Sequence, residues 1–533
     1  MLVAVYSFSE VPVFLDVDST KLHEHAYLSQ HKFDKIIFNF PHVGGKMKIQ
    51  LNRELLKNTF QSAKNVLRNN GRMMVSLCRG QGGTPADEPK RRWDDSWQIT
   101  EMAAHGDFIL VAVEPFIKKN FPDYKCVGYR GQDVEFNMEG ALVHIFSKRR
   151  PPYKSIDKET AKKRLALVPL FKGSNVSVPV FYSQLYRENP SKNSKSVVSF
   201  FLNLFYEELE KSMAELGKRE LKILTDEDIP VYVNYSRGVV CKVTENDAEK
   251  ELRLRLTSPQ IFNQALQLLE KLDLENGLIF FPGMYFNPLS GQDFRTESPI
   301  SFQYLLLGKN ASTFAYRYIH KLTKKFETID KTVTCSSRPQ NLVTNEVPHP
   351  IHTVDSLIKE GNLFEGELST EWVYELWQTE YVVSHVYSLK YKENTIEACV
   401  MYIDKLAELF FYAESWKDIW AIGHEVKIEK NLPTLKPALL YPLTYEFDIT
   451  VKYSMNDGLN EDKLYQVLWL SAGHVIEHVE LIDEFHSPQG WSSKTYRITY
   501  KSLDKPMYRS RVIDIHSHIV GKMLAASMRV TIS

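Results

Sequence analysis

Short apolar runs alternate with helical patterns through residues 1–150, and this alternation limits the folds open to the chain. A helix is expected over residues 50–69, with Gly71 as its C-terminal cap, and another is expected to begin at Trp93 and Trp97. The expected strands are residues 11–17, 34–40, 72–78, 108–113 and 141–146. Strands that alternate with helices predict a mostly parallel, doubly wound sheet, here closed by an antiparallel pair.

The second of these runs stops on residues that carry chemistry. After the apolar residues 36–38 come Asn39, Pro41 and His42, and then Gly44. In doubly wound sheets, ligands lie outside the carboxyl ends of the parallel strands. Asn39 offers hydrogen bonds, Pro41 stiffens the turn, and His42 supplies a ring and a possible base. The alternative is a purely structural turn.

Composition narrows the class of protein. The chain has 533 residues, which predicts three or four domains, and its 66 basic and 66 acidic residues argue against a generic polyanion binder. The five cysteines lie far apart without a C-x-x-C pair, so we expect no zinc site and a reducing compartment, the cytoplasm or the nucleus and nucleolus. We expect no membrane span, because no apolar run reaches about 18 residues, and no signal peptide.

The middle of the chain has fewer patterns. Residues 148–154 are expected to form a linker, and residues 197–220 a helix. Residues 276–288 predict a strand and a turn, residues 332–345 a loop, and residues 401–420 one long helix. The sequence predicts no chemical role for residues 155–395.

The last hundred residues have a clear order of elements. Residues 444–453 alternate with period two, and strands are also expected at residues 474–485, 494–502 and 528–533. With two intervening helices, the order β-α-β-β-α-β predicts a ferredoxin-like plait. His516 and His518 do not share a helix face, so no metal pair is expected there.

Three motifs in this region, "LYPLTYEFDI", "VELIDEF" and "YRITY", resemble the ferredoxin-fold anticodon-binding domain of phenylalanyl-tRNA synthetases over residues 438–533. The resemblance implies a tRNA- or RNA-binding module that uses the open face of its sheet. Candidates for RNA contact are Tyr445, Tyr496, Arg497 and Tyr500, because aromatic rings stack on unpaired bases. The alternative is that the tyrosines belong to the core.

Upstream, "MYIDKLAELFFYAESWKDIWA" looks like the synthetase catalytic domain just before this module. That family carries a glycine–x–glycine–x–acid–arginine pattern that binds ATP. Here Val400 and Tyr402 replace the glycines and Lys405 replaces the arginine, so we expect no synthetase activity.

The segments "FDKIIFNFPHVGGK", "GRMMVSLCRGQGGTPAD" and "YKCVGYRGQD" look like the Rossmann-like large-subunit rRNA uridine-N3 methyltransferases, over residues 11–147. The resemblance implies S-adenosylmethionine as cofactor, with Asp18 reaching its adenine. It places Asn39, Pro41 and His42 in the catalytic target-base site. It implies that a substrate-holding loop is formed by Arg79, Gln81, Gly82, Gly83 and Thr84.

One departure concerns the cofactor. The family begins with a strand and a glycine-rich turn, whereas the first strand here matches the family's third strand. A truncated isoform or incomplete gene model of an active enzyme is one explanation, and a product that does not bind the donor is the other. Removal of central strands would expose sheet edges, which favours the first explanation.

These patterns predict an α/β and α+β multidomain protein. The expected domains are a Rossmann-like methyltransferase domain lacking its first strands (1–150), a divergent synthetase-like middle region (151–435) and a ferredoxin-like βαββαβ plait (436–533). The predicted function is that of an RNA methyltransferase-like protein, directed by resemblance to uridine N3 of rRNA, with a C-terminal tRNA/RNA-binding module. The alternative is a non-catalytic RNA-binding protein. The identity of the RNA and the oligomeric state stay open.

Overall fold

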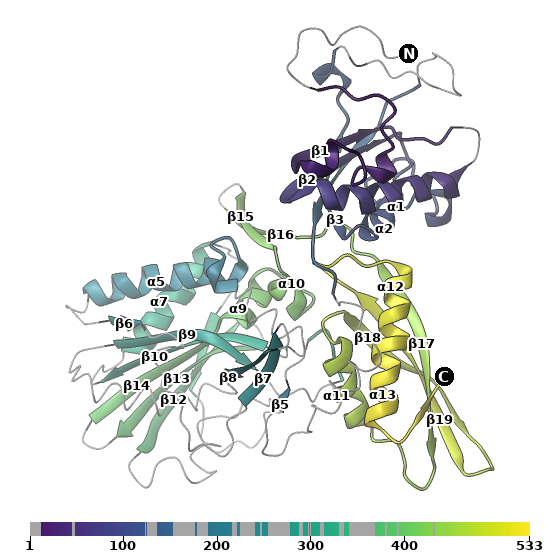
Figure 1. Ribbon diagram of the computed structural model, residues 1–533. Coiled ribbons are helices and arrows are strands. Elements are labelled where there is room, and N and C mark those ends of the chain that lie inside the picture. Colours follow the sequence, from purple (N-terminus) through teal and green to yellow (C-terminus); the bar gives the residue numbers. More distant parts are fainter. Residues whose placement is uncertain are drawn as a thin grey trace. The chain divides into compact units, whose positions relative to one another are not determined.

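The protein has a mixed α/β, multidomain architecture with several sheets (Figure 1). The computed structural model describes residues 12–44, 48–122, 124, 136–152, 176–177, 190–215, 221–223, 240–245, 248–253, 278–286, 292–296, 298, 300–309, 314–329, 335–339, 368–378, 381–391, 394–429 and 432–533. The first compact unit comprises Met1–Ser155, Pro437–Phe447 and Thr499–His518; the second comprises Ile156–Lys436, Asp448–Ile498 and Ile519–Ser533. None of the helices described is long and apolar enough to span a bilayer.

The first unit contains a four-stranded sheet in the order β1-β2-β4-β3. Its strands are β1 (Phe33–Asn39), β2 (Leu67–Leu77), β3 (Phe108–Pro115) and β4 (Leu142–Lys148), and its helices are α1 (Ile49–Val66) and α2 (Ile99–Ala104). Short 3-10 turns lie at Ser19–Lys21, Leu28–Gln30, Trp93–Asp95 and Lys118–Asn120. Only β1 and β2 pair in parallel; β2–β4 and β3–β4 are antiparallel, so the described sheet is less parallel than predicted.

One apolar face of α1 covers this sheet. Leu56, Phe60 and Ala63 recur at helical spacing and are fully buried. The Phe60 ring lies 5.3 Å from that of Phe108 on β3 and 4.9 Å from that of Phe146 on β4. Each such side chain stabilises the fold by about 1.5–3 kcal/mol through burial, and together they fix the helix above the strands.

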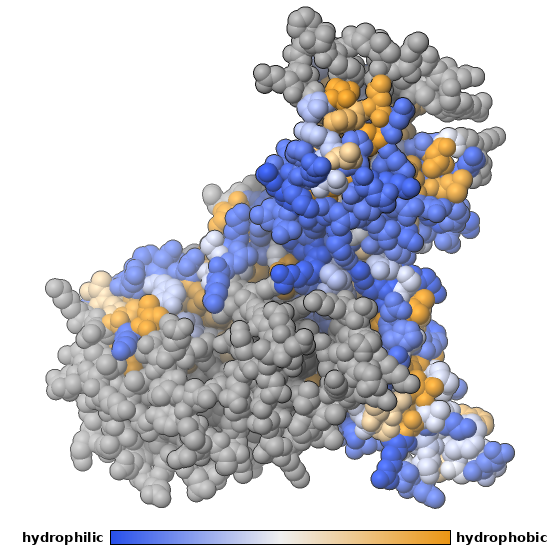
Figure 2. All heavy atoms as spheres, viewed as in Figure 1, coloured by the Kyte–Doolittle hydropathy of each residue, from blue (hydrophilic) through white to orange (hydrophobic). Residues whose placement is uncertain are grey.

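The strand predicted at residues 11–17 is not present in its described part. Residues 12–18 adopt no strand, and Val13, Phe14 and Leu15 are 45%, 40% and 65% exposed. Within the described residues no strand pairs with the outer edge of β1, so the predicted pairing partner of this edge is not formed by residues 12–18. Figure 2 shows a mostly hydrophilic visible face on this unit, with hydrophobic residues in a few small groups.

Gly71 is not a helix cap. Helix α1 ends at Val66 and β2 begins directly at Leu67, so Gly71 lies inside the strand. A Cβ there would stand 2.7 Å from Leu67 Cγ and 3.0 Å from the carbonyl oxygen of Asp34. The glycine therefore permits the close approach of neighbouring backbone rather than a helix terminus.

The helix predicted from Trp93 is likewise divided. A 3-10 turn covers Trp93–Asp95, and α2 begins only at Ile99. Gln98 between them has a positive φ of 51°, which interrupts the helical path.

The second unit is built on a seven-stranded sheet in the order β11-β12-β13-β14-β10-β9-β6. Its strands are β6 (Leu221–Ile223), β9 (Leu278–Phe286), β10 (Ile300–Lys309), β11 (Cys335–Pro339), β12 (Leu368–Gln378), β13 (Tyr381–Tyr391) and β14 (Asn394–Tyr402). Its helices are α5 (Val197–Glu215), α7 (Phe314–Ile329), α9 (Ile403–Phe410) and α10 (Trp416–Trp420), with a 3-10 turn at Pro190–Lys192. Smaller sheets are formed by β5 (Val176–Ser177), β7 (Val240–Glu245) and β8 (Ala248–Arg253), and by β15 (Glu425–Glu429) and β16 (Leu432–Lys436).

Two predictions for this region were wrong. The segment predicted as one long helix begins as the end of β14 and continues as α9 and α10, and Ser415 starts the second helix with a capping box to Asp418. An N-cap serine satisfies the amides of a new helix, so one helix does not continue through it. The predicted loop at residues 332–345 contains β11, which pairs with β12.

The C-terminal elements follow the order β-α-β-β-α-β, and their four strands form one sheet in the order β18-β19-β17-β20. The strands are β17 (Thr444–Ser454), β18 (Ile476–His486), β19 (Trp491–Lys501) and β20 (Thr531–Ile532). The helices are α11 (Glu461–Ala472), α12 (Arg509–Asp514), a π-helical stretch (Ile515–Gly521) and α13 (Lys522–Ser527).

Candidate functional site

The carboxyl ends of the parallel strands β1 and β2 meet at Asn39. Ladder pairing places Asn39 opposite Ser76, whose hydroxyl donates to Asn39 Oδ1 at 2.7 Å. The next residue, Phe40, has a positive φ of 50° and donates its amide to the Ser76 carbonyl at 2.9 Å. Asn39 is exposed, and its Nδ2 group makes no hydrogen bond within the described part of the chain. The tip of β1 thus presents a fixed amide donor to solvent.

His42 follows Asn39 by three residues and is also exposed, whereas Pro41 is buried. The amide of Gly44 donates to His42 Nδ1 at 2.8 Å. Because Nδ1 accepts this bond, the neutral ring carries its proton on Nε2 and acts there as a donor. The base role of His42 stays a prediction, and in this arrangement Nε2 is the ring nitrogen left for a ligand.

The loop after β2 lies against the same end of the sheet. The Gln81 carbonyl accepts the Trp97 amide at 2.8 Å, and the Trp97 ring lies 5.9 Å from that of His42. Gln81 Oε1 accepts from the amide of Cys78 at 3.1 Å, and Arg79 donates to the carbonyl of Glu88 at 2.6 Å. The structure therefore brings the β1 tip and the predicted substrate loop together, as the parallel pairing requires.

The interior of that loop is closed by its own side chains. Buried Asp87 accepts from the amides of Gly82 and Thr84 at 3.3 and 2.7 Å and from the Thr84 hydroxyl at 3.0 Å. A Cβ on Gly82 would stand 2.6 Å from His144 Nε2, and one on Gly83, whose φ is +77°, would stand 2.1 Å from Ser96 Oγ. The glycines therefore allow internal packing and leave no open backbone cradle.

His144 on β4 is the buried histidine beneath this loop. It is 0% exposed, and neither ring nitrogen has a hydrogen-bond partner among the described residues. Burial lowers the pKa of His144 to about 4, although the nearby Asp87 carboxylate opposes this shift. The ring is thus neutral near pH 7 and belongs to the support of the loop.

Asp18 does not meet these residues through any contact in the described part of the chain. It caps the turn Ser19–Lys21, where its carboxylate accepts from the Thr20 amide and hydroxyl at 2.9 and 2.7 Å. These hydrogen bonds lower the pKa of Asp18, which is exposed. The predicted place at the end of a strand is wrong, and the carboxylate caps a turn, while its role toward a cofactor stays a prediction.

An aromatic cluster, unpredicted by the sequence analysis, lies next to the tip. The Phe40 ring stands 5.0 Å from Phe116, 5.1 Å from Phe136 and 6.3 Å from Tyr124. The positive φ of Phe40 has no sequence signature, since glycine or asparagine usually fills such positions. The spacing of aromatic residues after residue 115 was the available signal.

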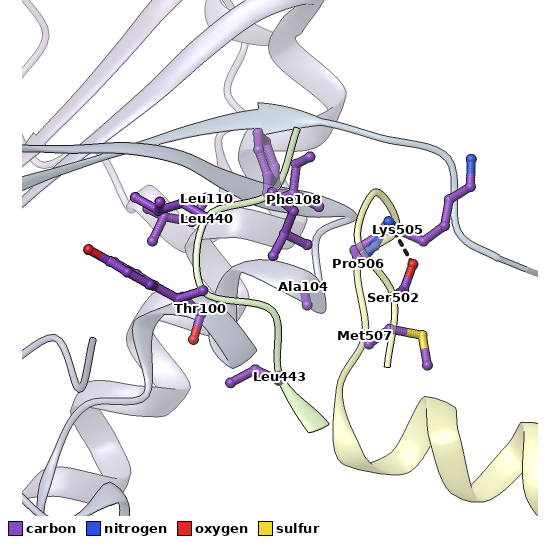
Figure 3. A pocket seen from close by; sticks show the side chains of 13 residues that line it. Thr100, Ala104, Phe108, Leu110, Leu440, Leu443, Ser502, Lys505, Pro506 and Met507 are labelled. Carbon is purple, nitrogen blue, oxygen red and sulfur yellow. Dashed lines mark hydrogen bonds between the residues drawn. The ribbon is translucent and has the colours of Figure 1, made fainter. Parts of the chain in front are cut away.

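The first unit also holds a small pocket of about 20 Å³, drawn in Figure 3. Its walls come from α2, β3 and the C-terminal segments 439–443 and 502–507, and are mostly apolar, with the Lys505 amide donating to Ser502 Oγ at 3.0 Å. None of the predicted site residues lines it. Close by, Asp107 pairs with Arg511 at 2.7 Å. The pocket lies where N-terminal and C-terminal segments of the first unit pack together. It lacks the convergent polar groups of a ligand site, so we assign it no binding role.

The C-terminal candidates divide into core and surface. Tyr445, Tyr496 and Tyr500 are only 9%, 1% and 0% exposed, so the structure corrects their assignment as stacking platforms. Alternation along β17 and β19 turns these rings into the core. Arg497 is half-exposed and makes a bidentate pair with Asp448 at 2.9 and 3.0 Å.

The remaining motif residues also have clear places. Val400 and Tyr402 are buried at the end of β14, and Lys405 pairs with Glu408 at 2.9 Å. His516 is buried against the Tyr500 hydroxyl at 3.0 Å, whereas His518 is exposed. Among the residues searched, no cluster could hold a metal ion.

Comparisons with known proteins agree with the sequence motifs. Residues 4–128 match the family model described as rRNA (uridine-N3-)-methyltransferase BTM5-like. The chain is 26% identical to human ferredoxin-fold anticodon-binding domain-containing protein 1, covering 95% of this chain and 88% of that protein. The mouse homolog is 49% identical over 155 residues, 29% of this chain and 25% of the homolog. A probable mitochondrial phenylalanine–tRNA ligase from Drosophila melanogaster is 29% identical over 95 residues, 17% of this chain and 21% of the ligase. The resemblances predicted from the sequence are confirmed, and they indicate an RNA-related function.

Proposed function

We propose that this chain, which resembles ferredoxin-fold anticodon-binding domain-containing protein 1 along nearly all its length, is an RNA methyltransferase-like protein that receives a uridine at the β1 tip. The observation that carries the proposal is the pair of exposed donors, Asn39 Nδ2 and His42 Nε2, at the carboxyl end of a parallel strand pair. Uracil carries a carbonyl oxygen on each side of N3, so two donors match it. Cytosine places an amino donor at one of these positions and is disfavoured.

The aromatic cluster supports the same ligand. Phe40 stands directly after Asn39 and is held by Phe116 and Phe136. Unpaired RNA bases stack on such rings while their edges make hydrogen bonds. The tip therefore combines edge recognition with an apolar neighbour.

S-adenosylmethionine is the cofactor that the methyltransferase family implies, and the described residues do not fit it. The Asp18 carboxylate is used by Thr20, and the sequence has no match to the family's glycine-rich cofactor turn; Gly82 and Gly83 of the predicted substrate loop offer no replacement, because His144, Asp87 and Ser96 fill the space there. The described residues bind and orient a base, because they offer donors and rings without a cradle for the methyl donor. This filled loop favours a second candidate function, non-catalytic RNA binding.

The C-terminal module would bind RNA through the open face of its sheet, in keeping with the element order of a ferredoxin-like plait. On this face Lys452 Nζ lies 3.5 Å from the centre of the Trp491 ring, and Arg497 lies beside Asp448. Arg497 stays a candidate for RNA contact, and Trp491 joins it in place of the buried tyrosines. The RNA partner would be rRNA or tRNA, met in the cytoplasm or nucleolus.

Base recognition can be tested with the full chain and fluorescently labelled single-stranded oligouridine and oligocytidine. Asn39→Asp keeps the oxygen that accepts from Ser76 and loses the outward donor, and His42→Phe keeps a ring and loses the Nε2 proton. Each substitution is expected to weaken oligouridine binding about tenfold, since one hydrogen bond to a base edge contributes roughly 1–2 kcal/mol.

The control is Asn70→Asp, which makes the same charge change at another exposed asparagine. It should leave binding within twofold of the unmodified chain. Equal affinity for the two oligonucleotides, or equal losses in all three variants, would refute the assignment of the tip.

Catalysis is tested separately with S-adenosylmethionine and rRNA, followed by mass spectrometry of the digested nucleosides. Appearance of N3-methyluridine, lost in Asn39→Asp, supports the enzyme. Uridine binding without methylation, together with no calorimetric signal for S-adenosylmethionine, supports the non-catalytic alternative.

A further inference from the structure

Strand β18 (Ile476–His486) lies at the edge of the C-terminal sheet, whose order is β18-β19-β17-β20 (Figure 1). It runs for 11 residues and, within the described part of the chain, pairs with β19 alone. An edge strand presents a row of backbone donors and acceptors that an additional strand can use. The other features of β18 decide what kind of strand fits.

The two halves of β18 differ. At its start, Ile476 is buried and its carbonyl accepts from Lys417, while Glu477 lies 3.7 Å from Arg295. Residues 480–486 are all exposed. The first half is therefore fixed by contacts with Lys417 and Arg295 within the second unit, and the second half extends into solvent as part of the sheet.

The exposed half carries large apolar side chains. Leu481 is 43% exposed, Ile482 is 39% exposed and Phe485 is 48% exposed. The Phe485 ring lies 5.3 Å from that of Trp491 on the neighbouring strand, so its position is held. Leu481 and Ile482 point to opposite faces, because side chains alternate along a strand. A bound strand would find apolar contacts on both faces.

The same half is acidic. The strand sequence IEHVELIDEFH contains four carboxylates and neither lysine nor arginine. Glu484 lies 3.7 Å from Lys494, whereas Glu480 and Asp483 make no ion pair within the described residues. The edge thus offers unneutralised negative charge between apolar side chains.

These features exclude two occupants. RNA would bring phosphates against Glu480 and Asp483, which repel them. A second copy of the strand would oppose acids to acids, and like charges directly across a strand pair destabilise it. Charges alone are an ordinary protection of an edge against aggregation, but such protection would not expose three large apolar residues in the same seven.

We propose that the exposed half of β18 is a docking edge for an extended segment of a partner protein in which lysine or arginine alternates with apolar residues. The partner adds as a fifth strand: backbone hydrogen bonds supply affinity, its cations lie on the face that carries Glu480 and Glu484, and its apolar side chains lie on the opposite face with Leu481 and Phe485. This inference is independent of the RNA site at the β1 tip. It concerns protein recognition, and RNA binding at β18 would contradict it.

The probe is a blocked, fluorescently labelled decapeptide of alternating valine and lysine, titrated against the full chain and followed by anisotropy. Binding is expected in the micromolar range, as for short strand-adding peptides. The double change Glu480→Lys and Glu484→Lys, on one face of the strand, should weaken it by at least about tenfold, because two attractive contacts become repulsive. The same variant should gain affinity for a peptide of alternating valine and glutamate.

The matched control reverses two exposed acids elsewhere, Glu54→Lys on α1 and Glu210→Lys on α5, with the same change in net charge. It should bind the basic peptide within threefold of the unmodified chain. Hydrogen exchange should show new protection at residues 480–486 when the peptide is bound. Leu481→Ser should reduce affinity without lowering the unfolding midpoint.

Three outcomes would overturn the proposal. They are equal peptide affinities for the β18 variant and its control, no protection at residues 480–486 at saturating peptide, and a β18 variant that gains affinity for single-stranded RNA while its peptide affinity is unchanged. A gain for RNA would place nucleic acid, not protein, at this edge.

Discussion

The N-terminal and C-terminal sheets have four strands each, and their candidate residues had opposite outcomes. In the first, Asn39 is the last residue of its strand, His42 follows three residues later, and both are exposed. In the second, Tyr445, Tyr496 and Tyr500 lie within strands and are buried. A strand end is released from the alternation that buries one face, whereas a residue within a strand must take one face or the other. Position along the strand therefore separates binding candidates from core more surely than residue type.

The largest expected effect is in the C-terminal sheet. Tyr496→Ala should lower the free energy of unfolding by about 3–5 kcal/mol, since it removes a buried ring and leaves a cavity. Chemical denaturation of the full chain measures this. Tyr496→Phe keeps the ring and should stay within about 1.5 kcal/mol. A small effect of the alanine change would mean that the tyrosine is free to act in binding, and the comparison would fail.

A pH effect should come from the N-terminal sheet. His144 has a pKa of about 4 when folded, below its ordinary 6.5, because it is buried. Between these values the unfolded chain binds the extra proton, so stability falls as pH falls from about 7 to 4. The loss at pH 5 is roughly 2 kcal/mol relative to pH 8. The free energy of unfolding, measured by denaturation at several pH values, should fall more steeply with decreasing pH for the unmodified chain than for His144→Phe. The same pH dependence in both proteins would contradict the low pKa of His144.

A substitution at Gly82 tests whether His144 and Asp87 fill the space beside this loop. Gly82→Ala should lower the free energy of unfolding by about 1–3 kcal/mol, because its Cβ would clash with His144 and Asp87. Gly44→Ala offers a control, since a Cβ there meets nothing within 4 Å. Gly44 also has a φ of +78°, so Gly44→Ala should lower the free energy of unfolding by a smaller amount, which comes from backbone strain alone. Equal losses at the two positions would show that the loop is open after all.

The smallest expected effect is at the surface. Arg497→Ala removes an ion pair with Asp448 in which both side chains are 43% exposed. Such pairs contribute about 0.2–1 kcal/mol, so stability should hardly change. If Arg497 contacts RNA, the Arg497→Ala variant should bind RNA more weakly, and its RNA affinity should depend less on salt concentration. A large loss of stability would instead place Arg497 with the buried tyrosines as a structural residue.

The sequence predicted element types better than their limits. Apolar periodicity found α1 and β17 because each has a single buried face. It missed the direct passage from Val66 to Leu67, since a strand may follow a helix without any turn residue. It also treated 401–420 as one helix, because the apolar pattern of β14 and α9 is continuous and only Ser415 marks the break.

The candidate site was predictable only in part. The motif at Asn39 and the loop at Gln81 could be assigned to one end of the sheet, because parallel strands end together. Three facts depended on tertiary contacts that a pattern does not contain: the hydrogen bond that fixes the His42 tautomer, the packing of His144 beneath Gly82, and the rings around Phe40.

The union of Met1–Ser155 with Pro437–Phe447 and Thr499–His518 has a consequence for biosynthesis. On the ribosome, the partner of Asp107 emerges about four hundred residues later, when Arg511 is made. Until then the apolar side chains of α2 and β3 that contact the C-terminal segments are exposed. Chaperones commonly bind such exposed apolar surface. A fragment that contains only one end of the chain would therefore lack part of the first unit. Expression fragments should include Met1–Ser155 together with Pro437–Phe447 and Thr499–His518.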